Sequence, residues 1–222
     1  MAKIIDTLDD AIEFVNSLYE IDSTAPSFGD EDYTVWTSLI NVAINIWESE
    51  EGMLWKELFV KLDDASDGDK TASAGDYSYD TPTDFIFPAS GYVWIGDNTN
   101  KTPYKVYKIN DQQLYENNKG NWCYFTVDTL EFNPNCDVKA GTIRYNYYKY
   151  ATKMTAAANT FEMSDPLFAV YYVISELKKE EGDTASASIA SQKLEAMRTK
   201  NEMATWDAED SILSTTDAGF GN

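Results

Sequence analysis

The side chains that most often carry out catalysis are scarce in this sequence. Histidine is absent from all 222 residues, so the chain lacks the commonest general base near neutral pH and the commonest metal ligand. A serine or cysteine nucleophile needs a base beside it, and no histidine can supply one here. The phosphate-binding patterns G-x-x-x-x-G-K-[ST] and G-x-G-x-x-G are also missing. We therefore expect no catalytic residue and no cofactor-binding residue.

Two cysteines and one acidic segment are the remaining candidates for metal or redox chemistry. Cys123 and Cys136 cannot by themselves form a structural zinc site, which typically needs four nitrogen or sulfur ligands. Nothing indicates an oxidising compartment, so two reduced thiols are favoured over a disulfide across a hairpin. The segment from Asp63 approaches a calcium loop, but Ala65 and Ala74 stand where a liganding acid and the closing glutamate are needed. We expect no metal site.

Carboxylate pairs and tyrosines leave two further functions open. Adjacent acids such as Asp9/Asp10 and Glu50/Glu51 could serve a glycosidase, although adjacent acids on helices usually face solvent. The 15 tyrosines could stack on sugars, although tyrosines on strands more often pack in cores and interfaces. An enzyme acting through carboxylates and a carbohydrate-binding or acidic interaction module therefore remain alternatives.

The net charge of −21 is unevenly distributed. Residues 85–163 carry 7 acidic and 8 basic side chains, whereas segments 1–62, 63–84 and 164–222 have net charges of −10, −6 and −6. This balance disfavours an ordinary nucleic-acid-binding protein and favours basic partners. No apolar run is long enough for a membrane span or a signal peptide, so we expect folding in a cytoplasm.

Helical periodicity marks the N-terminal part of the chain. A first helix is expected to begin at Thr7, whose hydroxyl can cap free N–H groups. A second helix is expected from residue 30 to about residue 47. It is apolar on much of its circumference, which is typical of a central bundle helix or of a subunit contact. The interface candidates that we select on it are Trp36, Ile40 and Trp47.

Two more helices are expected over residues 164–206. Asp165-Pro166 is a strong start signal, and Gly182 ends the first helix because glycine tolerates the left-handed conformation. Small residues in the second helix would let the two helices pack closely, and the interface candidates on it are Ala187, Ala190 and Met197. Residues 207–222 are polar and predict a tail that is disordered alone or ordered on a partner, which we call the extended arm. Its apolar anchors are Ile212, Leu213 and Phe220.

Between residues 85 and 150 the periodicity changes to short aromatic and β-branched runs. Clusters of Asn, Asp, Gly and Pro separate them, which is typical of strands joined by turns. Six strands are expected, with the sequences FIFPAS, GYVWIG, YKVYKI, WCYFTV, TLEF and TIRYNYYKY. In the last run Ile143, Tyr145 and Tyr147 alternate with Arg144, Asn146 and Tyr148, which predicts a half-buried antiparallel strand.

Together these patterns predict an α+β fold, a helical bundle with an inserted small antiparallel β domain. N-terminal helices in residues 1–62 and a C-terminal helical hairpin in residues 164–206 form the bundle. Residues 63–84 are expected to be an acidic loop, residues 85–163 the β domain, and residues 207–222 the arm.

The order of these elements resembles the head-to-tail adaptor (connector, or head-completion) proteins of tailed bacteriophages. One part of the resemblance is a strand, a turn, an L-x-F-x-P hairpin, a glycine turn and a tyrosine-rich strand. In this sequence these are Phe125 to Val127, Leu130, Phe132, Pro134, Gly141 and Tyr145 to Tyr150. The other parts are the helical pair that ends in QKLEAMRTKNEM, and DDAIEFVNSLY followed by a tryptophan-rich helix. The resemblance covers roughly Thr7 to Met203, and the acidic loop and the long tail lie outside the family pattern.

The resemblance implies a structural virion protein rather than an enzyme. Such proteins form a ring, usually of twelve copies, in the neck between capsid and tail, where the ring docks on the portal protein and contacts tail or nozzle proteins. Ring closure needs a heterologous interface, for which the residues selected above are the candidates. DNA would pass through an acidic lumen during packaging and ejection without sequence-specific binding. Assembly would occur in the host cytoplasm, with no membrane partner. Another virion protein, of the tail or the capsid decoration, is a further alternative.

Overall fold

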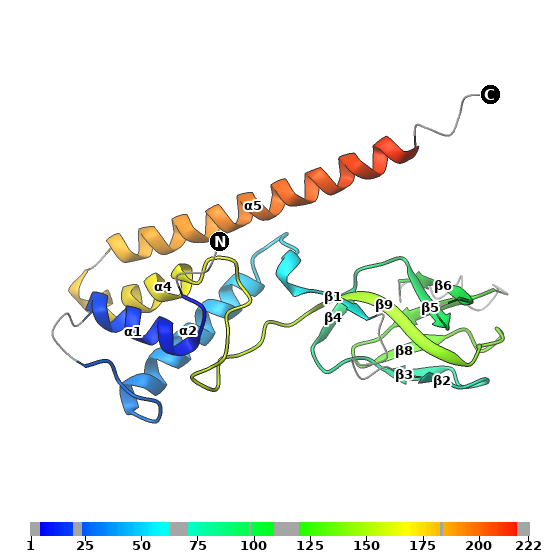
Figure 1. The fold of residues 1–222 in the computed structure, drawn as a ribbon, viewed down its shortest axis with the longest axis horizontal. Helices are drawn as coiled ribbons and strands as arrows, with labels where there is room; N and C mark the ends of the chain where they lie inside the picture. The colour runs from blue at the N-terminus through cyan, green and yellow to red at the C-terminus, as the bar shows by residue number, and fades with distance from the viewer. Residues whose placement is uncertain are drawn as a thin grey trace. The chain divides into compact units, whose positions relative to one another are not determined.

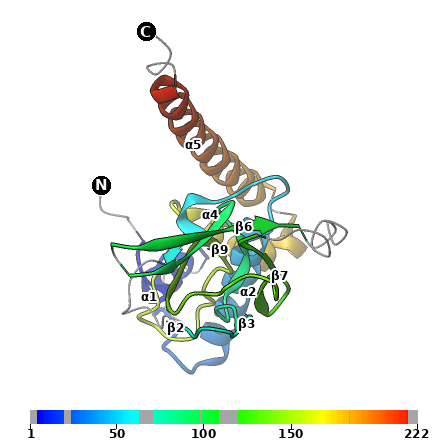
Figure 2. The same cartoon turned by 90° about the vertical axis from the view of Figure 1, so that its right-hand side faces the viewer.

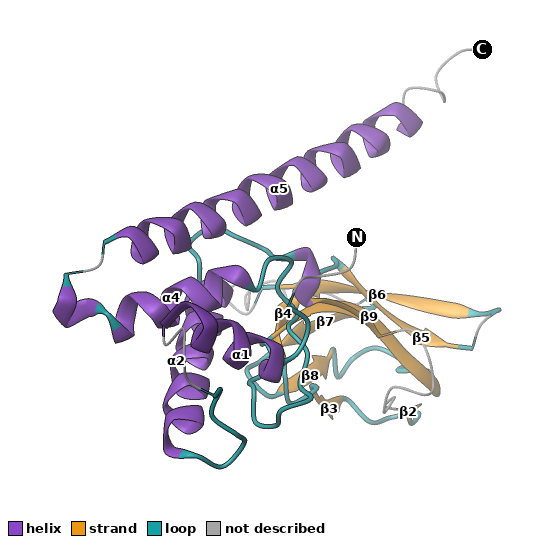
Figure 3. Cartoon of the chain, turned by 60° about the vertical axis from the view of Figure 1, so that its left-hand side comes forward, coloured by secondary structure: helices purple, strands orange, loops and turns teal. Residues whose placement is uncertain are grey.

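The computed structural model describes residues 5–19, 24–62, 71–97, 99–108, 120–182 and 184–216, with the backbone alone at residue 62 and from residue 204 onward. The chain divides into two compact units. A helical unit comprises residues 1–57 and 151–222, and a sheet unit comprises residues 58–150. Figure 3 shows that the long helices belong to the first unit and the strands to the second.

The helical unit is built around one central helix (Figure 1). Its helices in the described residues are α1 (Leu8–Tyr19), α2 (Glu31–Glu48), α4 (Leu167–Leu177) and α5 (Ala185–Thr216). α4 packs against each of the other three helices. It is also the most apolar of them, and its buried side chains are Phe168, Ala169, Val170, Val173 and Ile174. Short 3-10 turns lie at Lys56–Leu58 and Lys179–Glu181.

The predicted helix start and stop signals are confirmed. The N–H of Asp10 donates to Thr7 Oγ1 at 3.2 Å, and the N–H of Thr7 donates to the Asp10 carboxylate at 2.9 Å, which is a reciprocal capping box. Asp165 Oδ1 accepts the N–H of Leu167 at 3.2 Å where α4 begins. Gly182 has φ of +76° in the turn between α4 and α5, the left-handed conformation predicted for it.

Two asparagine side chains, one half-buried and one buried, connect irregular segments to the helices through hydrogen bonds. Asn41 Nδ2 donates to Met154 O at 2.9 Å, and the N–H of Met154 donates back to Asn41 Oδ1 at 2.8 Å. Asn201 Nδ2 donates to Leu54 O at 2.8 Å, and the N–H of Lys56 donates to Asn201 Oδ1 at 3.2 Å. Each asparagine therefore satisfies one backbone donor and one backbone acceptor outside the α-helices and strands.

The sheet unit is a curled, mixed sheet of nine strands in the described residues (Figure 2). They are β1 (Phe59–Leu62), β2 (Thr71–Ala72), β3 (Ser78–Asp80), β4 (Phe85–Pro88), β5 (Tyr92–Gly96), β6 (Lys101–Tyr107), β7 (Trp122–Phe125), β8 (Thr129–Phe132) and β9 (Gly141–Lys149). The order is β1-β9-β5-β6-β7-β8-β3, and β2 and β4 also pair with β9. All of these pairs are antiparallel except β6 with β7, which is parallel.

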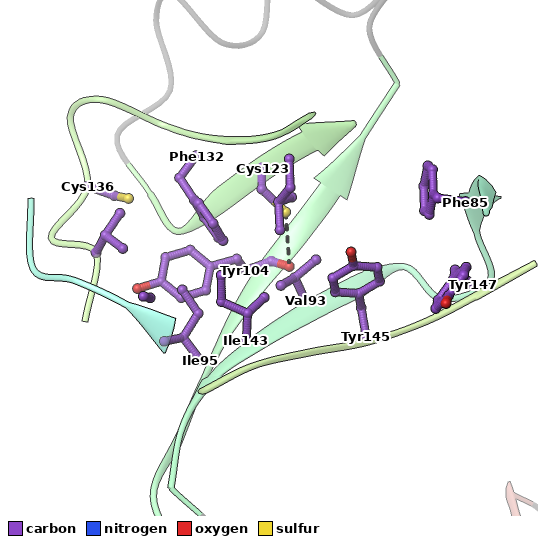
Figure 4. Packing of buried hydrophobic residues seen from close by; sticks show 13 residues of the cluster. Phe85, Val93, Ile95, Tyr104, Cys123, Phe132, Cys136, Ile143, Tyr145 and Tyr147 are labelled. Carbon is purple, nitrogen blue, oxygen red and sulfur yellow. Dashed lines mark hydrogen bonds between the residues drawn. The ribbon is translucent and has the colours of Figure 1, made fainter. Parts of the chain in front are cut away.

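An aromatic core fills the concave side of this sheet (Figure 4). The Tyr104 ring is buried and meets the Phe132 ring edge-on, with 4.9 Å between centroids. Phe85 stacks on Phe125 at 5.1 Å. The Cys123 thiol donates to Tyr104 O at 3.9 Å. Buried aromatic side chains contribute large apolar areas, so this cluster alone is a substantial core.

The predicted fold class is wrong, because the chain is not a helical bundle with a small inserted β domain. The six expected strands are present as β4 to β9, but β1, β2 and β3 join them and the sheet is mixed. β2 and β3 lie within the expected acidic loop 63–84, and β1 lies at the end of the expected helical segment 1–62. These three strands have only two to four residues and owe their extended conformation to pairing with β9 or β8, which local patterning does not reveal.

The C-terminal segment also differs from expectation. α5 continues to Thr216, so most of the segment expected to be an extended arm, residues 207–222, is helical. Residues 217–222 lie outside the described residues. In the part of the chain that the structure describes, no helix has both the length and the apolar character that crossing a bilayer requires.

Candidate interaction surface

α2 carries two parallel stripes of apolar residues with opposite exposure. One stripe is buried and consists of Tyr33, Trp36, Ile40, Ala43, Ile44 and Trp47. The other stripe, which we call the outer stripe, consists of Val35, Leu39, Val42 and Ile46. Val35 and Val42 are 45% and 42% exposed, and Leu39 and Ile46 are half-buried. The outer stripe has the 4-3-4 spacing of a helix-packing face, and in this unit it stays open to solvent.

The size of the side chains explains which stripe turns inward. Trp36 and Trp47 are 4% and 1% exposed, and burial of an indole removes far more apolar area from water than burial of valine. Trp36 meets the ring of Tyr19 edge-on at 6.3 Å, and Trp47 lies 5.4 Å from the ring of Trp55. With both indoles inside, the 100° step per residue leaves Val35 and Val42 on the outside.

Five of the predicted interface residues lie in the core of the helical unit. Trp36, Ile40, Trp47, Ala190 and Met197 are all less than 5% exposed, so their apolar character is accounted for by packing within one chain and they offer no surface to a second copy. Ala187 is exposed near the start of α5. For Ile212 and Leu213 the structure describes only the α5 backbone, and Phe220 lies outside the described residues.

The exposed apolar residues of α2 were not among the predicted interface residues. The apolar pattern of residues 30–47 contains both stripes, but the interface candidates selected on it, Trp36, Ile40 and Trp47, all belong to the buried stripe. Relative size is the signal that could have separated them, because the bulkiest apolar side chains gain most from a position in the core.

The surroundings of the outer stripe are acidic. Asp30, Glu31 and Asp32 stand at the start of α2, and the helix has no lysine or arginine in its 18 residues. Acidic side chains at this end also complement the positive end of the helix dipole. The hydroxyls of Thr34 and Ser38 donate to carbonyls of the preceding turn at 3.0 and 2.9 Å, so both find acceptors within the helix. The outer stripe is thus an apolar row with a negatively charged end.

Neither a metal-ligating cluster nor a reactive thiol is found among the described residues. They contain no cluster of three or more metal-ligating side chains. Both cysteines are free and buried, as expected for reduced thiols, and burial raises the pKa of the Cys123 thiol far above its usual range. A thiol held protonated is a poor nucleophile. No protein-family model matches the chain, and no curated protein matches it.

Proposed function

We propose that this protein is a non-enzymatic structural subunit of a virion, which forms a head-to-tail adaptor ring between the portal and the tail of a bacteriophage. The observation that supports this proposal best is the outer stripe of α2, an ordered apolar row on the surface of a charged protein. Exposed apolar rows of this kind commonly mark protein–protein contacts. The sequence resemblance described above supplies the class of assembly.

A ring places specific demands on the subunit. Each copy must present one surface to the next copy and a different surface to the previous one, because a heterologous contact repeats around the ring. A rigid helix with an apolar row can serve as one of these two surfaces. The row spans Val35 to Ile46, about 17 Å of helix at 1.5 Å per residue, which is enough for a contact of several side chains.

The charge of the chain agrees with an adaptor role. The two segments of the helical unit together carry 25 acidic and 8 basic side chains, a net charge of −17. Ordinary DNA binding depends on neutralisation of phosphates by lysine and arginine. A strongly acidic lumen would instead allow DNA to pass during packaging and ejection without being held.

The portal contact is assigned to the end of α5. This helix has 32 residues, and its first half packs on α4 through buried side chains such as Ala190 and Met197. Residues 207–222 follow the part of α5 that packs on α4, and we propose them as the docking segment for the portal. They include the three predicted anchors Ile212, Leu213 and Phe220.

Native mass spectrometry of the purified full-length protein with candidate portal rings tests this proposal. We expect complexes that carry about twelve copies on one portal, as a closed heterologous ring requires. A variant that lacks residues 207–222 is expected to keep the thermal unfolding midpoint of the wild type and to lose portal docking. A wild-type protein that remains monomeric with every portal would contradict the adaptor function and would favour a tail, decoration or carbohydrate-binding protein.

A further inference from the structure

The convex side of the sheet unit carries a cluster of basic and aromatic side chains. Side chains alternate between the two faces of a strand, and directly paired residues share a face. The register pairs Trp94 with Arg144, Tyr92 with Lys105, Lys61 with Asn146 and Phe59 with Tyr148. The core residues Val93, Ile95, Ile143, Tyr145 and Tyr147 occupy the alternate positions.

We call this surface of β1, β9, β5 and β6 the basic face. Its basic members are Lys61, Lys101, Lys105 and Arg144, and its aromatic members are Phe59, Tyr92, Trp94 and Tyr148. Phe59, Tyr92 and Trp94 are 42%, 48% and 39% exposed, and the last two rings lie 6.1 Å apart. The positions on these strands that share the face include no aspartate or glutamate.

A pocket of about 390 Å³ opens on the basic face. Its lining residues are Lys61, Ser90, Trp94, Lys101, Arg144, Tyr145 and Asn146. The described lining thus combines three cations with an indole and contains no carboxylate. Such a lining favours an anionic group that is joined to an apolar body.

The central cation of the pocket is held in place by the backbone. Arg144 is only 8% exposed, and its guanidinium donates to Gly96 O, the carbonyl at the end of β5. Asp97, whose carboxylate interacts electrostatically with Arg144, accepts the N–H groups of Thr99 and Asn100. These hydrogen bonds lower the pKa of Asp97 and keep its side chain in the turn between β5 and β6. Arg144 is thus a fixed positive charge rather than a mobile surface group.

We propose that the basic face receives α2 of a second copy of this chain, with the acidic start of α2 at the pocket and the outer stripe against Trp94 and Tyr92. This inference rests on the proposed ring function and specifies the two surfaces that close the ring. Carboxylates of Glu31 and Asp32 would meet Lys61, Lys101 and Arg144, and the apolar row would cover the exposed aromatic rings.

The dimensions of the two surfaces agree. Four strands at a spacing of about 4.8 Å span about 15 Å, which accommodates one helix with a diameter of about 10 Å. The two surfaces are also unlike and complementary within one chain, which is what a heterologous contact requires. One is apolar with an acidic end and has no cation, and the other is aromatic and basic.

The charge of the whole chain favours a second copy over nucleic acid. With a net charge of −21 the protein repels a long polyanion, and the basic face offers only four cations against it. An acidic helix adds few negative charges and contributes apolar contacts as well. The sheet unit carries 13 acidic and 9 basic side chains, a net charge of −4, so the helical unit at −17 is the more negative partner.

Charge reversal of both surfaces tests this inference. We expect the double variant Lys61→Glu/Lys101→Glu to lose self-association at least tenfold in sedimentation velocity and in portal-bound copy number, and Glu31→Lys/Asp32→Lys to do the same. The two variants mixed together are expected to associate with each other, because the reversed charges again attract. Lys139→Glu/Lys200→Glu is a control of equal charge change at exposed positions outside the basic face.

The outcomes separate this inference from the proposed function. Rings that form as well with Lys61→Glu/Lys101→Glu as with wild type would overturn the interface assignment and leave the adaptor function standing. A wild-type chain that does not self-associate, with or without portal, would overturn both. Binding of a labelled oligonucleotide at physiological salt that Lys61→Glu/Lys101→Glu abolishes would replace the second copy by nucleic acid as the occupant of this face.

Discussion

Val35 and Trp36 are neighbours in the sequence but face opposite environments. Trp36 is 4% exposed and packs edge-on against Tyr19, whereas Val35 is 45% exposed. This division repeats along α2, with Ile40 and Trp47 inside and Val42 outside. The stability of the helical unit and its capacity to assemble thus depend on different faces of one helix, and substitutions can separate them.

Substitution of the outer stripe should remove assembly without loss of the fold. We expect Val35→Glu/Val42→Glu to change the free energy of unfolding by no more than about 0.5 kcal/mol per site, as is usual for exposed positions. The same variant should not form rings, because the carboxylates would be buried in the contact. Trp36→Ala is the matched comparison and should cost about 3–5 kcal/mol, since it empties a core position. Chemical denaturation measures the free energy of unfolding, and sedimentation velocity measures ring formation. Equal destabilisation by the two variants would contradict the separation of α2 into a core face and an assembly face.

Gly141 is required where β9 approaches β5. Gly141 has φ of +148°, and a Cβ atom on it would lie 2.7 Å from Gly96 Cα. We therefore expect Gly141→Ala to destabilise the sheet unit by about 1–3 kcal/mol, through backbone strain and steric clash. Gly91→Ala is the control, because a Cβ atom at Gly91 meets nothing within 4 Å. If the two variants melt at the same temperature, the close approach of Gly141 to Gly96 does not contribute to stability and the prediction is wrong.

The capping box of α1 should make stability depend on pH. Backbone N–H groups of Thr7 and Asp6 donate to the Asp10 carboxylate and lower its pKa below the usual 3.8. A carboxyl whose pKa is lower in the folded state stabilises the fold above its unfolded pKa, and this stabilisation disappears as the pH falls through the folded pKa. We expect Asp10→Asn to be less stable than wild type at pH 7 and to approach it in acid below the pKa of about 3.9 for unfolded aspartate.

Thr7, the second residue of the capping box, allows a test of the box in which no charge is changed. Thr7→Ala should cost about 1 kcal/mol at pH 7, the usual effect of removal of a threonine cap. Urea denaturation at several pH values measures both variants. A difference between Asp10→Asn and wild type that grows as the pH falls below 4 would contradict the lowered pKa.

The two thiols should be inert in the folded protein. Cys123 is fully buried and Cys136 is 8% exposed, and burial raises the pKa of both thiols. We expect a thiol-specific reagent at pH 8 to label neither cysteine in buffer and to label both in guanidinium chloride, because the thiolate is the reactive form. Rapid labelling of the folded protein, or an absence of free thiols after unfolding without reductant, would contradict this prediction.

Much of the local structure could be predicted from the sequence. The six strands from Phe85 to Lys149 follow aromatic and β-branched runs, and the helix signals at Thr7, Asp165 and Gly182 act as expected. In β9, Ile143, Tyr145 and Tyr147 are buried as the alternation predicted, but Arg144 on the opposite face is buried as well. These features depend on neighbours within a few residues, which is the range that sequence patterns report.

The remaining features depend on partners that are distant in the sequence. Strand β2 has two residues and exists because Thr71 and Ala72 pair with Thr142 and Gly141 of β9. The parallel pairing of β6 with β7 is likewise a property of topology, and it makes the sheet mixed. The choice of Val35 over Trp36 as the exposed residue depends on the packing of α1 and α4 against α2. No local pattern reports the strand pairings, whereas on α2 the larger size of the Trp36 side chain is a signal that the sequence does contain.

Site-specific photo-crosslinking tests the central claim, which is assembly through the outer stripe of α2, most directly. A benzoylphenylalanine at position 42 would be placed on the outer face, and the same residue at the exposed position 200 of α5 would serve as the control. We predict that irradiation of assembled protein links position 42 to the sheet unit of a second copy, in a ladder of multimers, and that position 200 gives no such ladder. Assembled rings in which position 42 forms no cross-link between copies would contradict the claim.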